Sequence, residues 1–160
     1  MHDPRVHLVV VGDGETRPGL ERAASAQRLG DRVHFVGHAD HDALPAVLRS
    51  ADAFLLPSDL DAFPLVLLEA LACGLPAITT DAPGVRAMLA GSDAAEVVPV
   101  RDVDAMAAAV RRLAALRRDE LRRRGASARQ LVEERYALPA IVDRIEQVYA
   151  SALAGAAPRG

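Results

Sequence analysis

Short apolar segments alternate with longer segments of mixed polarity over the first hundred residues, and this alternation restricts the fold more than any other feature of the sequence. Most of the apolar segments contain β-branched residues and end near glycine or proline, as buried strands do. Strands that alternate with helices over short connections form a parallel sheet with helices on both faces. The sequence therefore predicts an α/β fold built on a doubly wound parallel sheet.

The bounds of the expected elements follow from the same pattern. We expect strands at 6–11, 32–37, 53–58, 77–80 and 97–100, and helices at 20–29, 43–49 and 64–73. The first strand is expected to be buried on both faces. From Asp102, an N-cap residue, the chain becomes helical, with further helices at 119–134 and 138–153. Residues 1–155 are predicted to form a single domain, and residues 156–160 a disordered tail.

The composition places the chain among globular proteins and excludes several classes. The chain has 160 residues, 51% of them hydrophobic, and its apolar runs are far shorter than a membrane span requires. The first residues carry no secretory signal pattern, and the one cysteine, Cys73, cannot form an internal disulfide. These features predict a cytoplasmic protein. A net charge of −3 and 3% aromatic residues argue against nucleic-acid binding.

The basic residues narrow the function further. All 19 are arginine, and the absence of lysine excludes Walker-A nucleotidases and Schiff-base enzymes, whose sites need an ammonium group. Arginines are frequent between positions 111 and 124 and alternate with acids in the segments that follow. This pattern favours a solvated helix face, with weak association with an anionic membrane surface as the alternative.

One carboxylate stands out within the most apolar helix. Glu69 lies within the predicted helix 64–73, which is apolar around its whole circumference and should be buried on every side. A buried carboxylate must be hydrogen-bonded. Either a protein group satisfies it, or it faces a polar ligand at the loop before the helix. Asp61, eight positions upstream in that loop, should lie near it, so the two acids could bracket a ligand rich in hydroxyl groups.

The start of the same helix offers a second recognition feature. The free N–H groups of Leu65 and Val66 and the positive end of the helix dipole favour an anion such as a diphosphate. Pro64, at the first helical position, contributes no N–H group, so this anion site has one donor fewer.

These residues carry a family resemblance. The segment "SADAFLLPSDLDAFPLVLLEALACGLPAITTDAPGV" (50–85), together with "VVVGDGE" and "RVHFVGH" upstream, resembles the family-4, or group-1, retaining glycosyltransferases of the GT-B fold. The similarity extends from about residue 6 to residue 153. It implies the Rossmann-like, C-terminal half of that fold, which binds the nucleotide sugar, followed by a helical C-terminal segment.

The resemblance also implies roles for individual residues. Asp61 and Glu69 become the catalytic-site acids, Asp61 binding hydroxyls of the transferred sugar and Glu69 the ribose hydroxyls. Main-chain groups of the loop at Phe63, Pro64, Leu65 and Val66 would contact the sugar and the diphosphate. The turn at Gly37 and His38 would lie beside the base, and Gly12 and Gly14 would form a tight turn at the edge of the donor cleft. The resemblance implies no metal and no cofactor beyond the nucleotide-diphosphate sugar itself.

The sequence departs from the family pattern at several positions. Asp61 stands where the family usually has Glu, and Pro64 where it has Gly. The segment 83–87 lacks the usual paired glycines and following Glu. The family's arginine and lysine for the diphosphate lie upstream of the segment "VVVGDGE" and have no counterpart here, and neither does the N-terminal acceptor domain.

Weaker motifs leave other interpretations open. Gly12-Asp13-Gly14 could begin a dinucleotide fingerprint, but the third glycine would fall at Arg17. Asp59-Leu60-Asp61 imitates a metal-binding Asp-x-Asp motif, although no second ligand cluster accompanies it. His38 and His41 could share a metal, but exposed loop histidines are more often simply polar.

The sequence thus predicts the donor-binding portion of a hexosyltransferase-type enzyme that transfers a glycosyl group from a nucleotide-diphosphate sugar to the hydroxyl of an unknown acceptor. The alternative is a non-catalytic fragment or split subunit that acts by associating with another chain. A missing N-terminal domain or a partner chain is the expected protein partner in either case.

Overall fold

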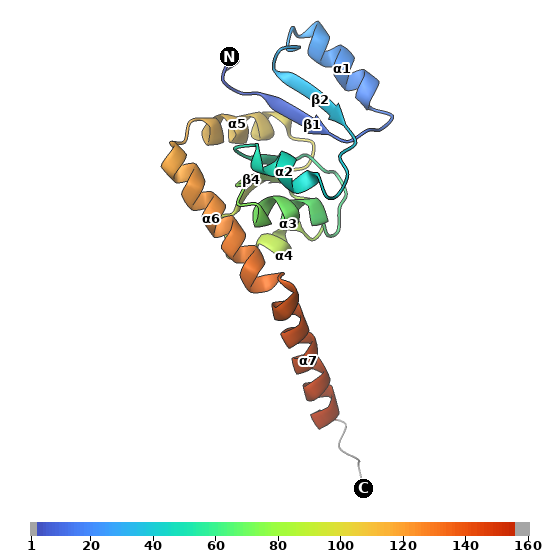
Figure 1. Ribbon diagram of the computed structural model, residues 1–160, viewed down its shortest axis with the longest axis vertical. Coiled ribbons are helices and arrows are strands. Elements are labelled where there is room, and N and C mark those ends of the chain that lie inside the picture. The colour runs from blue at the N-terminus through green and yellow to red at the C-terminus, as the bar shows by residue number, and fades with distance from the viewer. Residues whose placement is uncertain (1–2, 156–160) are drawn as a thin grey trace. The chain divides into compact units, whose positions relative to one another are not determined.

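The computed structural model describes residues 3–155, which divide into two compact units, unit 1 up to Val47 and unit 2 from Leu48 (Figure 1). The boundary lies within the short helix α2 (Leu44–Arg49). The predicted tail at 156–160 lies outside the described residues, and the single binding domain expected over residues 1–155 stays a prediction. No helix among residues 3–155 combines the length and the apolar composition needed to cross a bilayer.

Unit 1 contains two parallel strands and the helix that lies between them in the sequence. β1 (Leu8–Val11) pairs with β2 (Val33–Gly37), and α1 (Arg17–Ala26) connects them. The Arg17 guanidinium lies over the Phe35 ring of β2, 6.0 Å from its centroid. The helix begins three residues earlier than predicted because a proline occupies its first turn, where the missing N–H group costs nothing.

The expectation that the first strand is buried on both faces is wrong. Leu8, Val9 and Val11 are 40%, 48% and 40% exposed. β1 belongs to a sheet of only two strands, which the described part of unit 1 does not cover on both faces. The apolar side chains of β1 are therefore not fully buried within unit 1.

Unit 2 contains a three-stranded parallel sheet with helices on both faces, as the sequence predicts. β3 (Phe54–Leu56) and β5 (Ala95–Val98) flank β4 (Ala77–Thr80). The helices are α3 (Leu65–Ala72), α4 (Val85–Leu89), α5 (Val103–Ala114), α6 (Arg118–Arg135) and α7 (Leu138–Gly155). The Asp102 side chain caps α5 as expected, because it accepts a hydrogen bond from the Ala105 amide at 2.8 Å.

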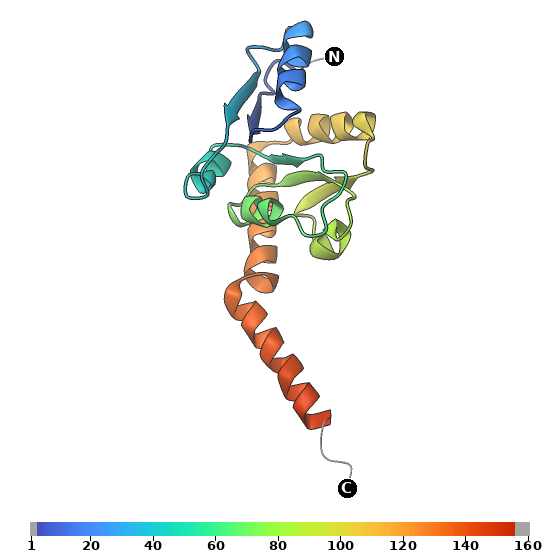
Figure 2. The same cartoon turned by 90° about the vertical axis from the view of Figure 1, so that its right-hand side faces the viewer.

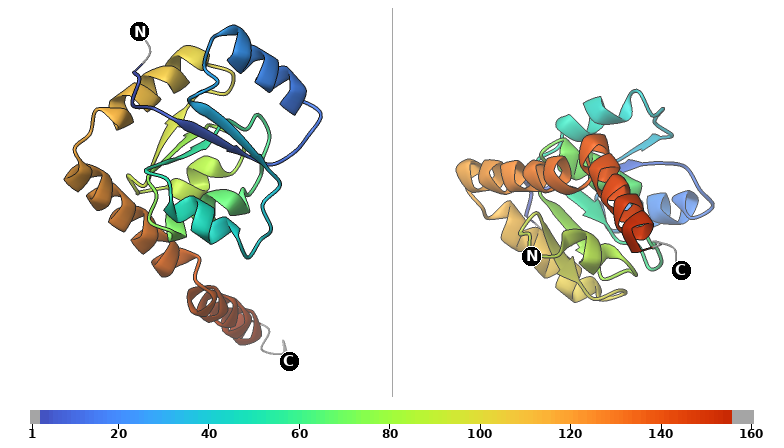
Figure 3. Two further views of the ribbon diagram at one scale, coloured as in Figure 1. Left: turned by 45° about the horizontal axis from the view of Figure 1, so that its top comes forward. Right: turned by 90° about the horizontal axis from the view of Figure 1, so that it is seen from below.

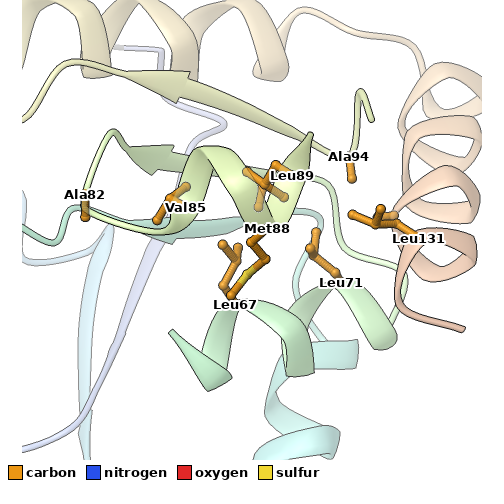
Figure 4. Packing of buried hydrophobic residues seen from close by; sticks show 10 residues of the cluster. Leu67, Leu71, Ala82, Val85, Met88, Leu89, Ala94 and Leu131 are labelled. Carbon is orange, nitrogen blue, oxygen red and sulfur yellow. The ribbon is translucent and has the colours of Figure 1, made fainter. Parts of the chain in front are cut away.

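The two faces of this sheet belong to separate apolar clusters. Leu67 and Leu71 of α3, Met88 and Leu89 of α4, and Leu131 of α6 pack on one face (Figure 4). On the other face, Ile78 and Val98 of the sheet pack against Ala109 and Leu113 of α5. Adjacent residues of β4, Ala77 and Ile78, thus enter different clusters, as the alternation of side chains along a strand requires.

Helix α6 packs closely against the end of α3 (Figure 3). A Cβ atom at Gly125 would lie 2.1 Å from the Gly74 carbonyl oxygen, so only glycine fits this crossing. Helix α6 ends at Arg135, with Tyr136 as its C-cap residue, and a new helix, α7, begins at Leu138 (Figure 2). The apolar side chains of α7 are largely exposed, with Leu138 at 74%, Val148 at 68% and Leu153 at 75%.

Three details of the architecture differ from the sequence-based expectation. The strands form two parallel sheets rather than one, because alternation specifies parallel connections without specifying which strands pair. β5 begins two residues earlier than expected, since the polar Glu96 lies within the strand and interacts with Arg112. Helix α4 was not expected at all, because five residues are too few to show a helical period.

Candidate functional site

Most of the glycines and the histidine predicted in unit 1 lie together at the carboxyl ends of β1 and β2. The Gly12 amide donates a hydrogen bond to the Gly37 carbonyl at 2.7 Å. Gly12 and Gly37 have φ angles of 119° and 74°, a region that favours glycine. Gly14 begins the turn into α1, because its carbonyl accepts a hydrogen bond from the Arg17 amide at 3.1 Å. The structure thus brings three of the four residues, Gly12, Gly37 and His38, into one turn region.

Asp13 fixes this turn region, a role that the sequence reasoning did not assign. Its carboxylate accepts a hydrogen bond from the His38 amide at 3.1 Å and forms an ion pair with Arg17. The hydrogen bond from Arg17 holds the pKa of the Asp13 carboxyl below its ordinary value, with a smaller contribution from the His38 amide. The position of Asp13 between two glycines after a strand was the only signal that could have revealed it.

In unit 2, the segment 57–64 forms the loop between β3 and α3 and carries the other predicted residues. The Thr80 hydroxyl, at the end of β4, donates a hydrogen bond to the Ser58 carbonyl. Ala62 packs against the turn after β4, where a Cβ atom at Gly84 would lie only 2.0 Å from the Ala62 carbonyl oxygen. The loop is therefore attached to the carboxyl end of β4 near both of its ends, which is where ligands bind in parallel sheets.

Asp61 and Phe63 occupy the centre and the end of this loop. Asp61 is half-buried, and its Oδ1 accepts a hydrogen bond from the Phe63 amide at 3.2 Å. The Phe63 side chain is 51% exposed, and its ring meets that of Tyr136 edge-on at 6.1 Å. Asp61 still has a second carboxylate oxygen that could accept from a ligand hydroxyl.

The start of α3 has the geometry expected of an anion site, with one change. Pro64 is the N-cap residue rather than the first helical residue, and it is fully buried. Because Pro64 has no side-chain acceptor, it does not cap the first amides of the helix. Leu65 is 64% exposed and Val66 is half-buried, so these amides begin the helix at an accessible position.

The expectation that the helix is buried on every side is wrong. Leu67, Ala70 and Leu71 are buried, but Leu65 and Ala72 are exposed and Glu69 is half-buried. One side of α3 packs into the core formed with α4 and α6, and the other side remains accessible. The Glu69 carboxylate therefore has a smaller desolvation penalty than full burial would impose, and a ligand is not required to explain its presence.

Two ion pairs that the sequence did not indicate connect the loops at this edge of the sheet. Arg101, after β5, donates from Nε to Asp59 of the loop before α3 at 2.7 Å. Arg86 forms an ion pair with Asp81, directly after β4, at 2.6 Å. No sequence signal distinguished these arginines from the solvated ones of α5 and α6.

The arginines of α5 and α6 pair with nearby acids, as expected for a solvated face. Examples are Arg112 with Glu96, Arg123 with Glu120 and Arg129 with Glu133. Weak membrane-surface association stays a prediction. Within residues 3–155, no group of three or more His, Cys, Asp or Glu side chains is arranged to hold a metal ion.

Comparison with known proteins assigns the chain to a family. Residues 1–131 match the family described as glycosyl transferases group 1. The glycogen synthase of Mycobacterium tuberculosis is 35% identical over 156 residues, which cover 95% of this chain and 36% of that protein. The sucrose-phosphate synthase of Thermosynechococcus elongatus superposes with a TM-score of 0.79 at 30% identity, over 95% of this chain and 40% of its own.

A second structure shares the fold alone. The Anabaena protein HepE, in complex with UDP, superposes with a TM-score of 0.81 at 19% identity, over 93% of this chain and 42% of its own. Taken with the family match, the parallel sheets and their flanking helices are those of a GT-B glycosyltransferase, of which the chain represents the C-terminal type of domain. The chain belongs to the group 1 glycosyltransferase family, and it spans 36% of the length of the first curated relatives that it matches.

Proposed function

We propose that this chain is the donor-binding portion of a retaining, hexosyltransferase-type group 1 enzyme. Its ligand is a nucleotide-diphosphate sugar, whose glycosyl group passes to an acceptor hydroxyl while the nucleoside diphosphate leaves. The observation that carries the proposal is the attachment of the loop 57–64 to the carboxyl end of β4, with Asp61 and the uncapped start of α3 in one segment.

The residues of this segment have the chemistry that such a donor needs. The second carboxylate oxygen of Asp61 accepts from hydroxyls of the transferred sugar, and Glu69 accepts from the ribose hydroxyls. The main chain of Phe63, Pro64, Leu65 and Val66 contacts the sugar and the diphosphate, whose charge the start of α3 favours. These groups position the donor and stabilise the charge that develops on the leaving diphosphate. No metal is needed in this scheme.

The unit 1 residues retain their predicted roles within the proposal. Gly37 and His38 are the expected contacts of the base, and Gly12 and Gly14 shape the adjacent turn. The relatives include a glycogen synthase and an alpha-D-kanosaminyltransferase, which supports the reaction class, and the UDP bound by HepE supports a nucleotide ligand. Because the match covers only 36% of the glycogen synthase, the residues that bind the acceptor are not assigned within this chain.

Calorimetry tests the proposal directly. The chain should bind one of the nucleoside diphosphates UDP, GDP or ADP, or the corresponding nucleotide sugar, weakly but measurably. Glu69→Gln removes the charge with little change of shape and should weaken binding about tenfold, because hydrogen bonds to charged groups contribute roughly 1.5–3 kcal/mol. Glu133→Gln, on the exposed face of α6, is the matched control and should bind as the wild type does. Folded protein that binds none of these nucleotides would contradict the proposal.

A second function is favoured by the apolar surface of α7. Ile145, Val148 and Leu153 are 48%, 68% and 75% exposed, and exposed apolar stripes of this kind mark association surfaces. The alternative is therefore a chain that works by pairing with another polypeptide. Size-exclusion chromatography with light scattering separates the two: a monomer that binds nucleotide sugars supports donor binding, whereas a stable oligomer without nucleotide affinity supports the alternative.

A further inference from the structure

Arg101 has a backbone conformation that is unfavourable for its residue type. Its φ angle is 60°, in the left-handed region that normally requires glycine or asparagine. It occupies the third position of a turn that the Asp102 amide closes by donating to the Pro99 carbonyl at 3.3 Å. Strain of this kind persists only where surrounding structure or function compensates for it.

The side chain of Arg101 makes a long-range connection. Its ion pair with Asp59 joins the loop after β5 to the loop after β3, and β4 lies between these two strands. The guanidinium therefore spans the carboxyl end of the three-stranded sheet. The hydrogen bond to Asp59 raises the pKa of Arg101 above its ordinary value, so the arginine is charged at neutral pH.

The stability that this ion pair contributes is smaller than the conformational strain at Arg101. The Arg101 and Asp59 side chains are 82% and 50% exposed, and exposed pairs contribute little to folding. A left-handed conformation costs a non-glycine residue more than such a pair returns. A glycine at position 101 should therefore give a more stable fold, and stability alone does not explain an arginine at this position.

The position of Asp59 suggests that reason. Asp59 precedes Asp61 by two residues in the loop 57–64. The Thr80 hydroxyl holds this loop through the Ser58 carbonyl, and Ala62 packs against Gly84. Both of these contacts hold the main chain, one at each end of the segment 58–62. Between them, the ion pair of Asp59 with Arg101 holds the segment through a side chain, close to Asp61.

We propose that Arg101 is a positioning residue for the glycosyl group of the donor: through Asp59, it fixes the loop so that Asp61 meets the sugar hydroxyls. The inference rests on the proposed donor-binding function. It distinguishes the two parts of the donor, because Asp61 is assigned to the sugar alone, whereas the diphosphate is assigned to the main chain at the start of α3 and the nucleoside to Glu69 and the unit 1 residues. Arg101 should therefore control the affinity for the nucleotide sugar and leave the affinity for the free nucleoside diphosphate unchanged.

The test uses the full chain and two matched probe pairs, UDP with UDP-glucose and ADP with ADP-glucose, titrated by NMR. Arg101→Gly should raise the urea midpoint, leave the Kd of the nucleoside diphosphate within twofold, and raise the Kd of the nucleotide sugar about tenfold. Arg28→Gly is the control, because Arg28 also has a positive φ of 55° and lies in unit 1. It should raise the urea midpoint and change neither Kd.

Exchanging the charges of Asp59 and Arg101 tests whether their ion pair positions the loop or whether Arg101 has only a structural role. Asp59→Arg alone should weaken nucleotide-sugar binding as Arg101→Gly does, and Asp59→Arg combined with Arg101→Asp should recover most of the lost affinity. Three results for Arg101→Gly would each overturn the inference: unchanged binding of the nucleotide sugar, equal weakening of the nucleotide sugar and the nucleoside diphosphate, or a lowered urea midpoint. A double variant that recovers no affinity would overturn it as well. A wild-type chain that binds neither probe pair would instead remove the proposed function on which the inference rests.

Discussion

The close crossing of α6 over the end of α3 predicts that Gly125→Ala lowers stability, although helix propensity alone predicts that it raises stability. Alanine is favoured over glycine in a helix interior by about 1 kcal/mol, so Gly125→Ala would normally stabilise α6. Here the new methyl carbon would lie 2.1 Å from the Gly74 carbonyl oxygen, whereas such contacts essentially never fall below 3.0 Å. The substitution should therefore destabilise unit 2.

The magnitude follows from the kind of contact. The two backbones must separate by roughly 1 Å, and no side-chain rotation can relieve the overlap because both partners are main chain. Overpacking costs up to about 3 kcal/mol, which leaves a net loss of about 2 kcal/mol after the gain in helix propensity. For a chain of this size, that loss lowers the melting temperature by roughly 4–8 °C.

Gly19→Ala is the matched control for this experiment. Gly19 lies within α1, and its added Cβ atom would meet only the Arg22 side chain, at 4.0 Å. It should stabilise the protein by about 0.5–1 kcal/mol. Thermal and urea unfolding followed by circular dichroism measure both variants. If Gly125→Ala stabilises the chain as Gly19→Ala does, the close packing of α6 on Gly74 is refuted.

Two further predictions concern the loops of the site. Gly84→Ala should lower the free energy of unfolding by about 2 kcal/mol and weaken nucleotide-sugar binding, because φ is 87° and the Cβ atom would strike the Ala62 carbonyl. Gly91→Ala is the control: φ is also positive there but the space is larger, so it should lower stability and leave binding unchanged. Arg17→Gln should shift the pKa of Asp13 toward its ordinary value, measurable by carboxyl NMR titration. Since folding lowers that pKa, the wild type should be more stable than this variant at neutral pH, and the difference should narrow as the pH falls through the folded pKa, leaving the pH-independent contact of Arg17 with Phe35; a difference that does not change with pH would contradict the linkage.

The sequence was most informative where a single local rule determines structure. β4 was predicted with its observed bounds because four apolar or β-branched residues lie between a proline and an aspartate. The start of α5 was predicted because Asp102 has the side chain that caps a helix. The family resemblance likewise rested on one contiguous segment, in which order and spacing are directly visible.

Features that depend on the meeting of distant segments could not be predicted in the same way. The close approach of Gly84 to Ala62 and the pairing of Arg101 with Asp59 join loops that are far apart in the sequence. The half-buried state of Glu69 depends on which side of α3 meets α4 and α6, which an all-apolar helix does not reveal. The strained φ of Arg101 depends on the turn after β5, whose position was expected two residues later.

The loop before α3 and the start of that helix are proposed to bind a nucleotide sugar. The most direct test of this proposal is an NMR titration of the isotope-labelled chain with UDP-glucose and ADP-glucose, following every assigned backbone amide. We expect saturable shifts that are largest at the amides between Asp61 and Val66 and at Glu69, and that are weakened in Glu69→Gln. Shifts confined to α7, or no shifts at millimolar ligand in the folded protein, would contradict it.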